Sequence, residues 1–502
     1  MIRTRFAPSP TGPLHIGGLR TALFNYLAAK KYGGEFILRI EDTDSSRYVP
    51  DSVDYILESL KWVGIKPDKG ILADGKIDPE YCQSERAKSG IYLKYAEDLV
   101  KSGHAYYAFD SVLDLMAEKD KDPKFTYNAT SRERMKNSLT LPANEVKTLL
   151  EIRNDWVIRF KMPDEPEIIT TFDTIRGVIN TSTDTLDDKV LWKKSDSLPT
   201  YHLASVVDDH LMEITHVIRG EEWLPSLPLH YMLYLALSWV PPGYTHLADI
   251  LKPIGCGPGK LSKRDGDKLG FPVFPIEWKS KSISVSGYRE TGFFPDALIN
   301  LLMFYGWRPA EIKGEKAQEI YSLNELINVF DLARCTKTGA HFDYTKAKWF
   351  NKEYLKIKSD REILEELDLE TALGARTEYY QKILDLVKPR LTFPLDILEQ
   401  GSVFFHDPDG IRLKDFEENE ENIPEALELA KDLIKTDSPS ENFEPTIIKR
   451  YGGWKEAIKT INCLRMIISG SSKGLDMKAT LGILGKETLI NRIELFKKNY
   501  GY

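Results

Sequence analysis

The amino-acid sequence predicts an α/β protein, with a doubly wound sheet in its N-terminal part and an almost entirely helical C-terminal part. Residues 2–7 form a short strand candidate, followed by a Pro/Gly turn. A helix is predicted over 17–32, where leucines recur at i, i+4 and i+8. The apolar run 36–40 then predicts a buried strand, which completes a β-α-β unit. From about residue 346 the helical pattern is almost unbroken.

The middle of the chain is less regular. Residues near 84–200 mix helical patterns with polar and Lys-rich connections, and we interpret them as an insertion that splits the doubly wound fold. The fold is expected to resume with a strand over 201–207, a polar break at 208–210 and a second strand over 212–218. This pattern implies two strands joined by a tight turn. A Gly-rich loop follows at 255–267.

Size and composition describe an ordinary multidomain chain. At roughly 100 to 200 residues per domain, 502 residues predict about three or four domains, and 42% hydrophobic residues allow each domain a core. The net charge of −8 does not exclude a nucleic-acid partner, because only the local Lys/Arg surface contacts phosphate. The four cysteines lie far apart without a C-x-x-C pair, so neither a disulfide framework nor a cysteine zinc site is indicated.

No targeting or membrane segment is indicated. The N-terminus lacks the apolar region of a signal peptide and the composition of an Arg/Ser-rich presequence. The longest apolar stretch, around 298–305, is much shorter than the ~20 residues that span a membrane. We therefore expect a cytoplasmic protein with reduced thiols and no membrane role.

Residues 8–18 carry the first candidate for phosphate chemistry. A strand ends there in a turn, and a helix begins at Gly17 and Gly18 with free backbone N–H groups and the positive end of its dipole. Glycines allow the backbone to approach adenine or phosphate, and His15 can donate a hydrogen bond to a phosphoryl oxygen. Taken alone, the segment is equally well explained as a Gly-rich helix start with a capped surface histidine.

The loop 255–267 carries the second candidate. Lys260, Ser262, Lys263 and Arg264 are donors flanked by glycines on both sides, and such a loop can close cations on a departing pyrophosphate. Taken alone, an exposed basic turn is the commoner explanation of this pattern.

Together the two segments resemble the signatures of class I aminoacyl-tRNA synthetases. HIGH is present as His15-Ile16-Gly17-Gly18, and KMSKS is present as Lys260-Leu261-Ser262-Lys263-Arg264. The stretches 5–12, 39–44 and 217–223 sharpen the resemblance to the bacterial type of the glutamyl-tRNA synthetase family. The resemblance spans essentially the whole chain and is strongest before residue 270.

The resemblance implies a domain order as well as a fold. It predicts a Rossmann-like doubly wound catalytic domain with an inserted acceptor-end-binding domain, a stem-contact region with the KMSKS-like loop, and an all-α anticodon-binding domain. The corresponding residues are 1–83 with 201–255, 84–200, 256–345 and 346–502.

Two departures from the family pattern stand out. Gly18 replaces the final histidine of HIGH, as is common in glutamate-specific members, so one phosphate donor must come from elsewhere. The cysteine-rich zinc motif that many members carry should fall near 104–130, but residues 104–109 read His-Ala-Tyr-Tyr-Ala-Phe. We therefore predict no zinc.

A glutamate pocket needs cations and one acid, because the substrate carries two carboxylates and an ammonium group. The planar fork of arginine suits the side-chain carboxylate, since it bonds both oxygens, whereas the amide of glutamine presents donors to donors. Arg5 and Arg219 each end a predicted strand, where doubly wound sheets bind ligands, and Glu41 could pair with the ammonium. Individually, each arginine is more often a surface ion pair.

The resemblance implies specific roles for the candidate site residues. His15, Lys260 and Lys263 are expected to be catalytic, while Ser205 stands where other members often carry Asn, so its role is open. The residues expected to bind glutamate are Arg5, Ala7, Ser9, Glu41, Tyr201, Ser205 and Arg219. Those expected to bind ATP are Gly17, Gly18, Glu222, Trp223, Leu261, Ser262 and Arg264. Asp44 and Arg47 are expected to contact tRNA.

No metal site within the protein is predicted. Residues 208–210, with His202 and His216, could suggest one, but adjacent residues on a strand turn point in different directions. Mg²⁺ is expected to arrive with the phosphates of ATP.

The implied activity is the ATP-dependent ligation of L-glutamate to tRNA(Glu) through a glutamyl-adenylate, by a monomer. An enzyme that also charges tRNA(Gln) is the alternative. A glutaminyl-tRNA synthetase is opposed by Arg219 and the helical C-terminus, and a short glutamylating paralogue by the residues after 345. A catalytically silent tRNA-binding relative is opposed by the presence of His15, Lys263 and Glu41.

Overall fold

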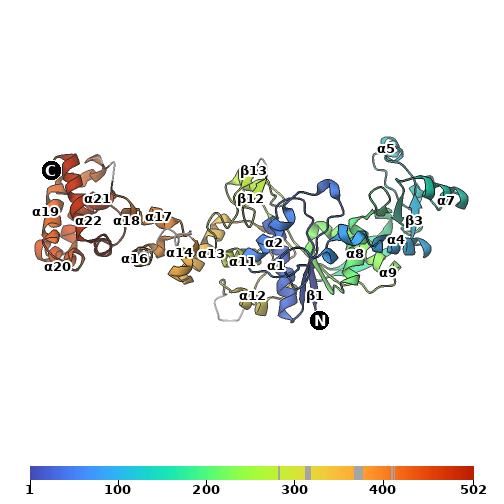
Figure 1. The fold of residues 1–502 in the computed structure, drawn as a ribbon, viewed down its shortest axis with the longest axis horizontal. Helices are drawn as coiled ribbons and strands as arrows, with labels where there is room; N and C mark the ends of the chain where they lie inside the picture. The colour runs from blue at the N-terminus through green and yellow to red at the C-terminus, as the bar shows by residue number, and fades with distance from the viewer. Residues whose placement is uncertain (281–282, 311–317, 367–376, 409–410, 412) are drawn as a thin grey trace. The chain divides into compact units, whose positions relative to one another are not determined.

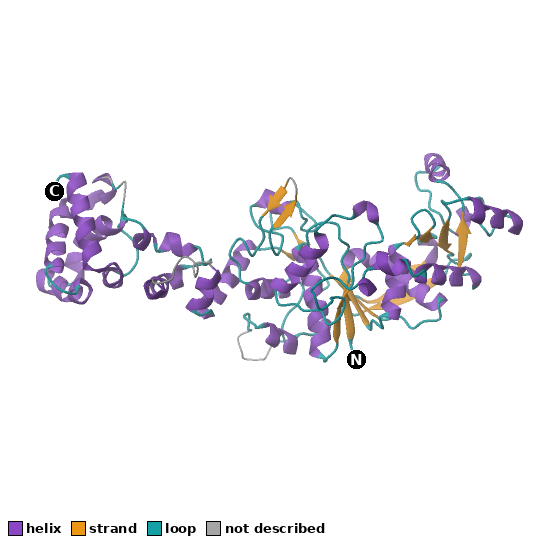
Figure 2. Cartoon of the chain, viewed as in Figure 1, coloured by secondary structure: helices purple, strands orange, loops and turns teal. Residues whose placement is uncertain are grey.

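The computed structural model describes two compact units of the chain (Figure 1). Unit 1 contains residues 1–291 and 295–347, and unit 2 contains residues 292–294 and 348–502. Unit 1 mixes strands and helices, whereas the described elements within unit 2 are helical (Figure 2). The residues described are 1–280, 283–310, 318–366, 377–408, 411 and 413–502.

The first β-α-β unit is built as predicted. Strands β1 (Arg3–Phe6) and β2 (Glu35–Leu38) are parallel neighbours connected by helix α1 (Ile16–Lys31). The buried face of α1 includes the leucines that predicted it. The spacing of the leucines therefore identified this unit correctly.

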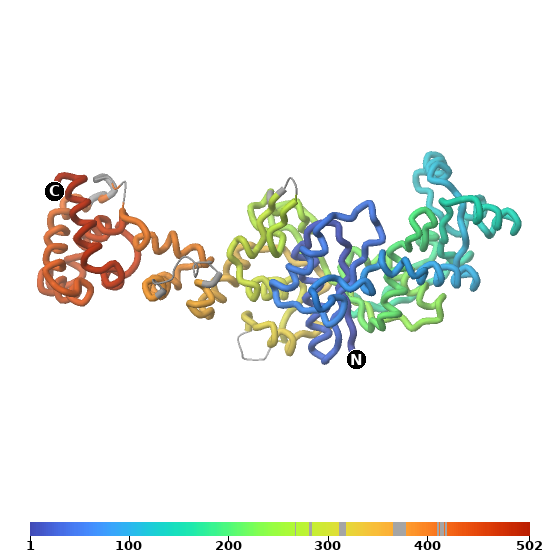
Figure 3. The backbone as a smooth tube through the Cα atoms, in the orientation of Figure 1, coloured from blue at the N-terminus to red at the C-terminus, as the bar shows by residue number. Residues whose placement is uncertain are grey.

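A second sheet, in the order β6-β5-β10-β9, continues the core of unit 1. Strands β9 (His216–Gly220), β10 (Gly243–Leu247) and β5 (Ile168–Asp173) are parallel, and β6 (Gly177–Ser182) pairs antiparallel with β5. In Figure 3 the blue N-terminal segment lies beside the green segment near β9, where β1 and β9 are in contact.

One residue of α1, Asn25, connects β1 with β9. Its backbone carbonyl accepts a hydrogen bond from the Thr4 hydroxyl, and its side-chain Nδ2 donates to the carbonyl of Ile218. The carboxyl ends of both strands therefore lie side by side, which is where a doubly wound fold binds its ligands. The predicted doubly wound architecture is confirmed.

The prediction of a strand over 201–207 is wrong. These residues belong to helix α8 (Tyr201–Leu211), and the following strand begins only at His216. Residues 203–209 are all buried, so the segment shows no alternation between apolar and polar faces. A short, fully buried run cannot be assigned to strand or helix by its periodicity, and the two valines favoured the wrong choice.

The predicted insertion contains its own antiparallel sheet, in the order β3-β4-β7-β8. Its strands are β3 (Ala105–Ala108), β4 (Val157–Phe160), β7 (Val190–Lys193) and β8 (Leu198–Pro199). The hairpin β5-β6 departs from this sheet and joins β10 instead. Helices of the segment are α3 (Gln83–Ala87), α4 (Ile91–Lys101), α5 (Val112–Lys121), α6 (Ala129–Arg132) and α7 (Ala143–Ile152).

Unit 1 also contains elements outside the three sheets described above. Among them, the short helix α10 (Asp265–Leu269) ends the Gly-rich loop. The others are α2 (Ser52–Trp62), α9 (Leu227–Ala236), β11 (Ile250–Leu251), β12 (Trp278–Ser280), β13 (Ile283–Val285), α11 (Pro295–Met303), α12 (Leu323–Val329) and β14 (Ala340–His341).

Unit 2 is helical, as the sequence pattern predicts. Its last four helices enclose a core of buried aliphatic and aromatic side chains, among them Leu433, Phe443 and Leu464. The helices are α13 (Tyr344–Ile357), which begins in unit 1, α14 (Asp360–Glu366), α16 (Thr377–Val387), α17 (Asp396–Gln400), α18 (Ser402–Phe405), α19 (Ile423–Ile434), α20 (Pro439–Tyr451), α21 (Trp454–Ser469) and α22 (Met477–Tyr500).

A buried ion network, which we call the Asp209 network, joins β1, β2 and α8. Oδ1 of Asp209 lies 3.0 Å from Nε of Arg5 and 2.7 Å from Nη1 of Arg39. Nη2 of Arg39 lies 2.8 Å from Oε1 of Glu41. Burial alone would raise the pKa of Asp209, but the two arginines outweigh it and lower that pKa. The network therefore holds the carboxyl ends of both strands against α8.

Asp209→Asn is expected to destabilise unit 1 by about 3–5 kcal/mol, because Arg5 and Arg39 then stay buried without their shared carboxylate. Urea unfolding followed by tryptophan fluorescence measures the change. The matched control is Asp98→Asn on α4, whose carboxylate pairs with Lys94 and Lys101 at the surface. Water screens those pairs, so the control should lose less than about 1 kcal/mol. Equal effects of the two variants would contradict the role of the network.

Candidate active site

Two adjoining cavities open at the carboxyl ends of β1 and β9 in unit 1. The larger, about 540 Å³, is lined by residues 8–15 together with Glu41, Tyr201 and Trp223, and we call it the Tyr201 cavity. The smaller, about 400 Å³, is lined by residues of α1 and by 260–263, and we call it the Lys260 cavity. Both cavities are lined by His15, Gly18, Glu222 and Lys263.

His15 stands in the shared wall as a hydrogen-bond donor without an acceptor. Its Nδ1 accepts the backbone N–H of Gly17 at 3.1 Å and so caps α1. Burial, together with the charges of Lys263 and Lys260, lowers the pKa of His15 to about 3. The neutral ring therefore carries its proton on Nε2, and that atom is buried without a hydrogen-bond partner in the described chain.

Two glycines allow the backbone to pack closely around this histidine. A Cβ at Gly18 would lie 2.7 Å from a methyl carbon of Leu14, so a side chain there would displace that leucine. Gly12 has a φ of 115°, and a Cβ there would lie 3.6 Å from Nζ of Lys263. The lysine-bearing loop thus reaches the segment that leads into α1, as the resemblance of the two signatures requires.

The cations of the Gly-rich loop are in different electrostatic states. Lys260 Nζ lies 2.7 Å from Oδ1 of Asp249 and 3.2 Å from Oε2 of Glu222, which compensate its charge. Lys263 has no ion-pair partner in the part of the chain that the structure describes, and burial lowers its pKa. Lys263 is therefore the cation available to a ligand in either cavity.

The backbone of the same loop is anchored beneath these lysines. Leu261 is buried, and its N–H donates to the carbonyl of Ile250 at 2.8 Å. Ser262 donates to Oδ2 of Asp265 from both its backbone N–H, at 2.8 Å, and its hydroxyl, at 2.7 Å. The Arg264 side chain is exposed. These bonds fix residues 261 and 262 of the loop beside β11.

Arg219 is buried behind the wall of the Tyr201 cavity. Its Nη1 donates to the hydroxyl of Tyr201 at 3.0 Å, and the Tyr201 ring packs on Trp223 with 4.0 Å between centroids. Burial raises the pKa of Tyr201, while the charges of Arg219 and Arg5 both oppose that shift. Arg5 and Arg219, which were both predicted to bind the amino acid, are therefore both close to Tyr201.

Glu41 reaches the Tyr201 cavity from the end of β2. Its Oε1 accepts from Arg39, and its Oε2 makes no hydrogen bond to the residues that the structure describes. Burial raises the pKa of Glu41, against the opposing charges of Arg39 and Arg5. One carboxylate oxygen is thus left for a ligand in the cavity.

Most of the predicted site residues come together, and the rest lie just outside the cavities. Arg5, Ser205 and Arg219 are buried beneath the lining, while Ala7 is partly buried and Arg264 exposed. Asp44 and Arg47 pair with each other at 2.7 Å on the rim. The predicted residues that line a cavity are Ser9, His15, Gly17, Gly18, Glu41, Asp44, Arg47, Tyr201, Glu222, Trp223, Lys260, Leu261, Ser262 and Lys263.

Sequence reasoning missed the residues that support the site from below. Arg39 lies within the apolar strand candidate, and an arginine in a buried strand is itself a signal of a buried ion pair. No comparable sequence pattern identified Asp249, which pairs with Lys260. The same is true of His246, which contacts Arg219, and of Asp173, which contacts His246. Asp173 and His246 are 73 residues apart in sequence, so only the fold brings these two side chains together.

The described residues include no group of three histidine, cysteine or carboxylate side chains placed to hold a metal ion. Asp208 and Asp209 bond to arginine, glutamine and tyrosine side chains instead. Among the helices that the structure describes, none is long and apolar enough to cross a membrane.

Comparison with known families matches nearly the whole chain. Residues 1–349 match the catalytic domain of the class I tRNA synthetases (E and Q), and residues 352–496 match an anticodon binding domain. The glutamate–tRNA ligases of Porphyromonas gingivalis and Phocaeicola vulgatus are 46% and 47% identical to this chain, each over 98% of it and 97% of the relative.

Two solved structures are similar along nearly their full length. The glutamate tRNA ligase of Elizabethkingia meningosepticum, in complex with its amino acid, has a TM-score of 0.91 and 45% identity over 98% of both chains. The glutamate-tRNA synthetase of Elizabethkingia anophelis has a TM-score of 0.88 and 44% identity, over 98% of this chain and 99% of that one. The chain therefore belongs to the class I tRNA synthetases for glutamate and glutamine, and within them to the family of the glutamate–tRNA ligases.

Proposed function

We propose that this protein ligates L-glutamate to tRNA(Glu) through a glutamyl-adenylate, consuming ATP and releasing AMP and pyrophosphate. The observation that carries the proposal is the wall between the two cavities, where the neutral His15 presents a buried, unpartnered Nε2–H beside the uncompensated cation of Lys263. A neutral donor and a free cation on one wall suit a triphosphate whose charge moves toward the leaving group.

In the first step, the α-carboxylate oxygen of glutamate forms a bond to the α-phosphorus of ATP, and the bond from that phosphorus to the bridging oxygen of pyrophosphate breaks. His15 donates to the phosphoryl oxygens and Lys263 stabilises the leaving pyrophosphate. Lys260, held by Asp249 and Glu222, steadies the closed loop. No protein nucleophile is needed. In the second step, a terminal ribose hydroxyl of tRNA attacks the glutamyl carbonyl and AMP leaves.

The amino acid would occupy the Tyr201 cavity. The free Oε2 of Glu41 is available to the ammonium group, and Arg219, which has no carboxylate partner among the described residues, is available to the side-chain carboxylate. Ser9 lines the cavity and would contact the substrate directly. Arg5, Ala7 and Ser205 are proposed to shape the pocket from behind this lining.

ATP would lie against the N-terminus of α1 and the Gly-rich loop. Gly17 and Gly18 offer backbone approach, Leu261 and Ser262 line the Lys260 cavity, and Trp223 supplies an apolar wall near the adenine. Glu222 and Arg264 would border the nucleotide. Mg²⁺ would be held mainly by the ATP phosphates and would neutralise part of their charge. We expect no zinc.

The tRNA would extend from the rim of the Tyr201 cavity, where Asp44 and Arg47 are exposed, to the helical residues. We keep the proposed domain limits of 84–200 for the acceptor end, 256–345 for the stem and 346–502 for the anticodon. A cytoplasmic monomer is the expected state.

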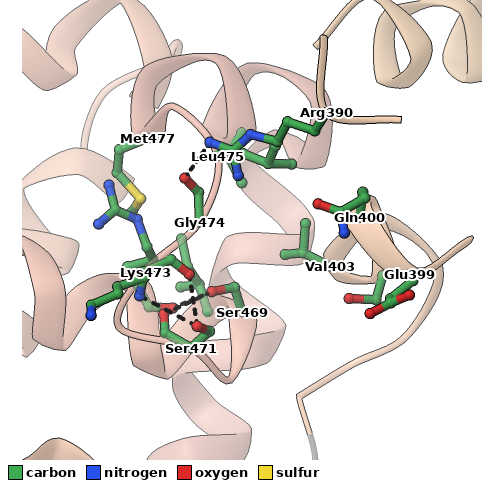
Figure 4. Close-up of a pocket in the computed structure, with 14 residues that line it drawn as sticks. Arg390, Glu399, Gln400, Val403, Ser469, Ser471, Lys473, Gly474, Leu475 and Met477 are labelled. Carbon is green, nitrogen blue, oxygen red and sulfur yellow. Dashed lines mark hydrogen bonds between the residues drawn. The ribbon is translucent and has the colours of Figure 1, made fainter. Parts of the chain in front are cut away.

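A cavity within unit 2 supports a nucleobase-binding role for the helical part. It measures about 270 Å³ and is lined by cationic, hydroxyl and apolar side chains, including Arg390, Arg465, Lys473 and Met477 (Figure 4). Arg390 donates to the carbonyl of Gly474 at 2.8 Å across one side of the cavity (Figure 4). Nε of Arg465 is buried without a partner in the described chain, which leaves one donor for a base.

Aminoacylation of purified tRNA(Glu) and tRNA(Gln), each with glutamate and with glutamine, tests the proposed function. We expect glutamate on tRNA(Glu) with release of AMP and pyrophosphate, and no charging with glutamine. Charging with glutamine, or adenylate formation that never reaches tRNA, would overturn the proposal. Glutamate on tRNA(Gln) would identify an enzyme that does not discriminate between the two tRNAs.

Lys263→Ala is expected to slow glutamate activation by about 100-fold or more, on the scale of a lost charge-stabilising donor. A single-turnover measurement with bound tRNA isolates the activation step. Lys268→Ala serves as the control, because Lys268 is an exposed lysine of the adjacent α10. An unchanged rate for Lys263→Ala would refute its role.

Arg465→Ala is expected to raise the KM for tRNA by about tenfold, the effect of a lost hydrogen bond from a charged donor, while the KM for glutamate stays constant. Steady-state aminoacylation with varied tRNA gives both constants. Lys459→Ala, an exposed cation on the same helix α21, is the control for general loss of positive charge. Equal effects at the two positions would point to nonspecific electrostatics rather than the cavity.

A further inference from the structure

The guanidinium group of Arg219 is surrounded by neutral acceptors. Its Nε donates to Nε2 of His246 at 3.0 Å. Its Nη1 donates to the Tyr201 hydroxyl at 3.0 Å and to Nδ1 of His230 at 3.3 Å. Its Nη2 donates to the carbonyl of Trp223 at 3.2 Å. Four of the five N–H groups of a guanidinium are thus occupied, without any carboxylate among the described partners.

The strand register of the β6-β5-β10-β9 sheet brings the side chains of Asp173, His246 and Arg219 into one row. His246 of β10 is directly opposite Arg219 of β9, and Tyr244 of β10 is opposite Asp173 at the end of β5. Oδ2 of Asp173 accepts both the backbone N–H and Nδ1–H of His246 at 2.8 Å. Oδ1 of Asp173 accepts the backbone N–H groups of Ile175 at 2.9 Å and Arg176 at 2.8 Å.

Asp173 decides which nitrogen of His246 carries the proton. Burial would raise the pKa of Asp173, but its hydrogen bonds from His246 and the backbone outweigh burial and lower it, so the carboxylate is ionised. Burial lowers the pKa of His246, so its ring is neutral. An ionised acceptor at Nδ1 keeps the proton there, and the lone pair of Nε2 faces Arg219.

Two further histidines are connected to Arg219: His230 presents a ring-nitrogen lone pair to it, and His202 contacts His230. Since Nδ1 of His230 accepts from Arg219, its Nε2–H must donate to Nδ1 of His202, 3.1 Å away. Burial and the charge of Arg219 lower the pKa of His230 well below its usual range, and burial with Lys189 lowers that of His202 to about 4. Both rings are therefore neutral, and both tautomers follow from the position of Arg219.

We propose that Asp173, His246, His230 and His202 are positioning residues, which hold the Arg219 fork in one orientation through neutral lone pairs and leave its charge for the side-chain carboxylate of the substrate. The inference rests on the proposed function, in which Arg219 binds glutamate. It adds four residues to that function, two of which, His246 and His230, contact the guanidinium group and none of which lines the cavities.

The same arrangement accounts for discrimination against glutamine. The Tyr201 hydroxyl accepts from Arg219, so its own proton is available to a ligand, and one N–H of Nη2 remains unused. A carboxylate supplies two acceptor oxygens to these two donors, whereas an amide supplies one oxygen and one donor group. If His246 carried its proton on Nε2 instead, two donors would face each other and Arg219 would have to turn away.

Asp173→Asn tests the tautomer. An amide whose oxygen stays on the two backbone N–H groups of Ile175 and Arg176 places its NH2 group beside Nδ1 of His246, where it can donate and move the ring proton to Nε2. We expect the KM for glutamate to rise about tenfold, with the KM for ATP and for tRNA unchanged, and the preference for glutamate over glutamine to fall by a similar factor. Thermal unfolding of the variant checks that unit 1 remains folded. A general loss of kcat with unchanged KM for glutamate would overturn the inference.

Substitutions of His246 separate positioning from packing. His246→Gln can still present a carbonyl oxygen to Nε of Arg219, so it should raise the KM for glutamate less than His246→Leu. In the His246→Gln background no ring tautomer exists, so adding Asp173→Asn should change that KM by less than about twofold. The same tenfold effect of Asp173→Asn in both backgrounds would show that Asp173 acts through packing and would overturn the inference. The control is His210→Gln, because His210 stacks on Trp239 and is not among the described partners of Arg219.

Arg219→Gln distinguishes failure of the inference from failure of the proposed function. If Arg219→Gln leaves the KM for glutamate unchanged, the arginine does not bind the substrate and the proposed glutamate pocket is wrong. If Arg219→Gln abolishes glutamate binding while Asp173→Asn and His246→Leu behave as the wild type, the pocket stands and the positioning role is overturned.

Discussion

The candidate site depends on one buried carboxylate that two strands share. Asp209 of α8 accepts from Arg5 of β1 and from Arg39, which follows β2, and Arg39 in turn holds Glu41. These groups are almost fully buried, so the charges can be tolerated only if they remain paired in this geometry. The pairing requires α8 to be a helix that packs against both strand ends. The same contacts place Tyr201 at the start of α8 beside the cavity that Glu41 enters.

The cations of the site differ in whether carboxylates of the protein neutralise their charge. Arg39 contacts three carboxylates and Lys260 contacts two, whereas Arg219 and Lys263 contact none among the described residues. A compensated cation contributes to the framework, and an uncompensated one leaves an attractive potential for an anion. The two uncompensated cations are those for which the proposed reaction supplies anions: the side-chain carboxylate of glutamate at Arg219 and pyrophosphate at Lys263.

Neutral histidines allow this distribution of charge in a buried site. His15 uses Nδ1 to cap α1 and keeps Nε2–H for a ligand, while His246 uses Nδ1–H for Asp173 and keeps the lone pair of Nε2 for Arg219. In both cases the bond at one ring nitrogen determines the chemistry of the other. Burial lowers the pKa of each ring, so the orientation of the proton is kept without adding positive charge.

The sequence by itself determined the first β-α-β unit, the helical C-terminal part and the two signature segments, because spacing, glycines and local donor patterns act over a few residues. Most of the site residues that it identified line the two cavities. Only the tertiary structure decided that 201–211 is a helix, because a run buried on all sides carries no periodicity. The tertiary structure likewise decided which cations are compensated. Lys260 and Asp249 are near in sequence, but Arg219, His246 and Asp173 lie on three strands, and only their register in the sheet brings the three side chains into one row.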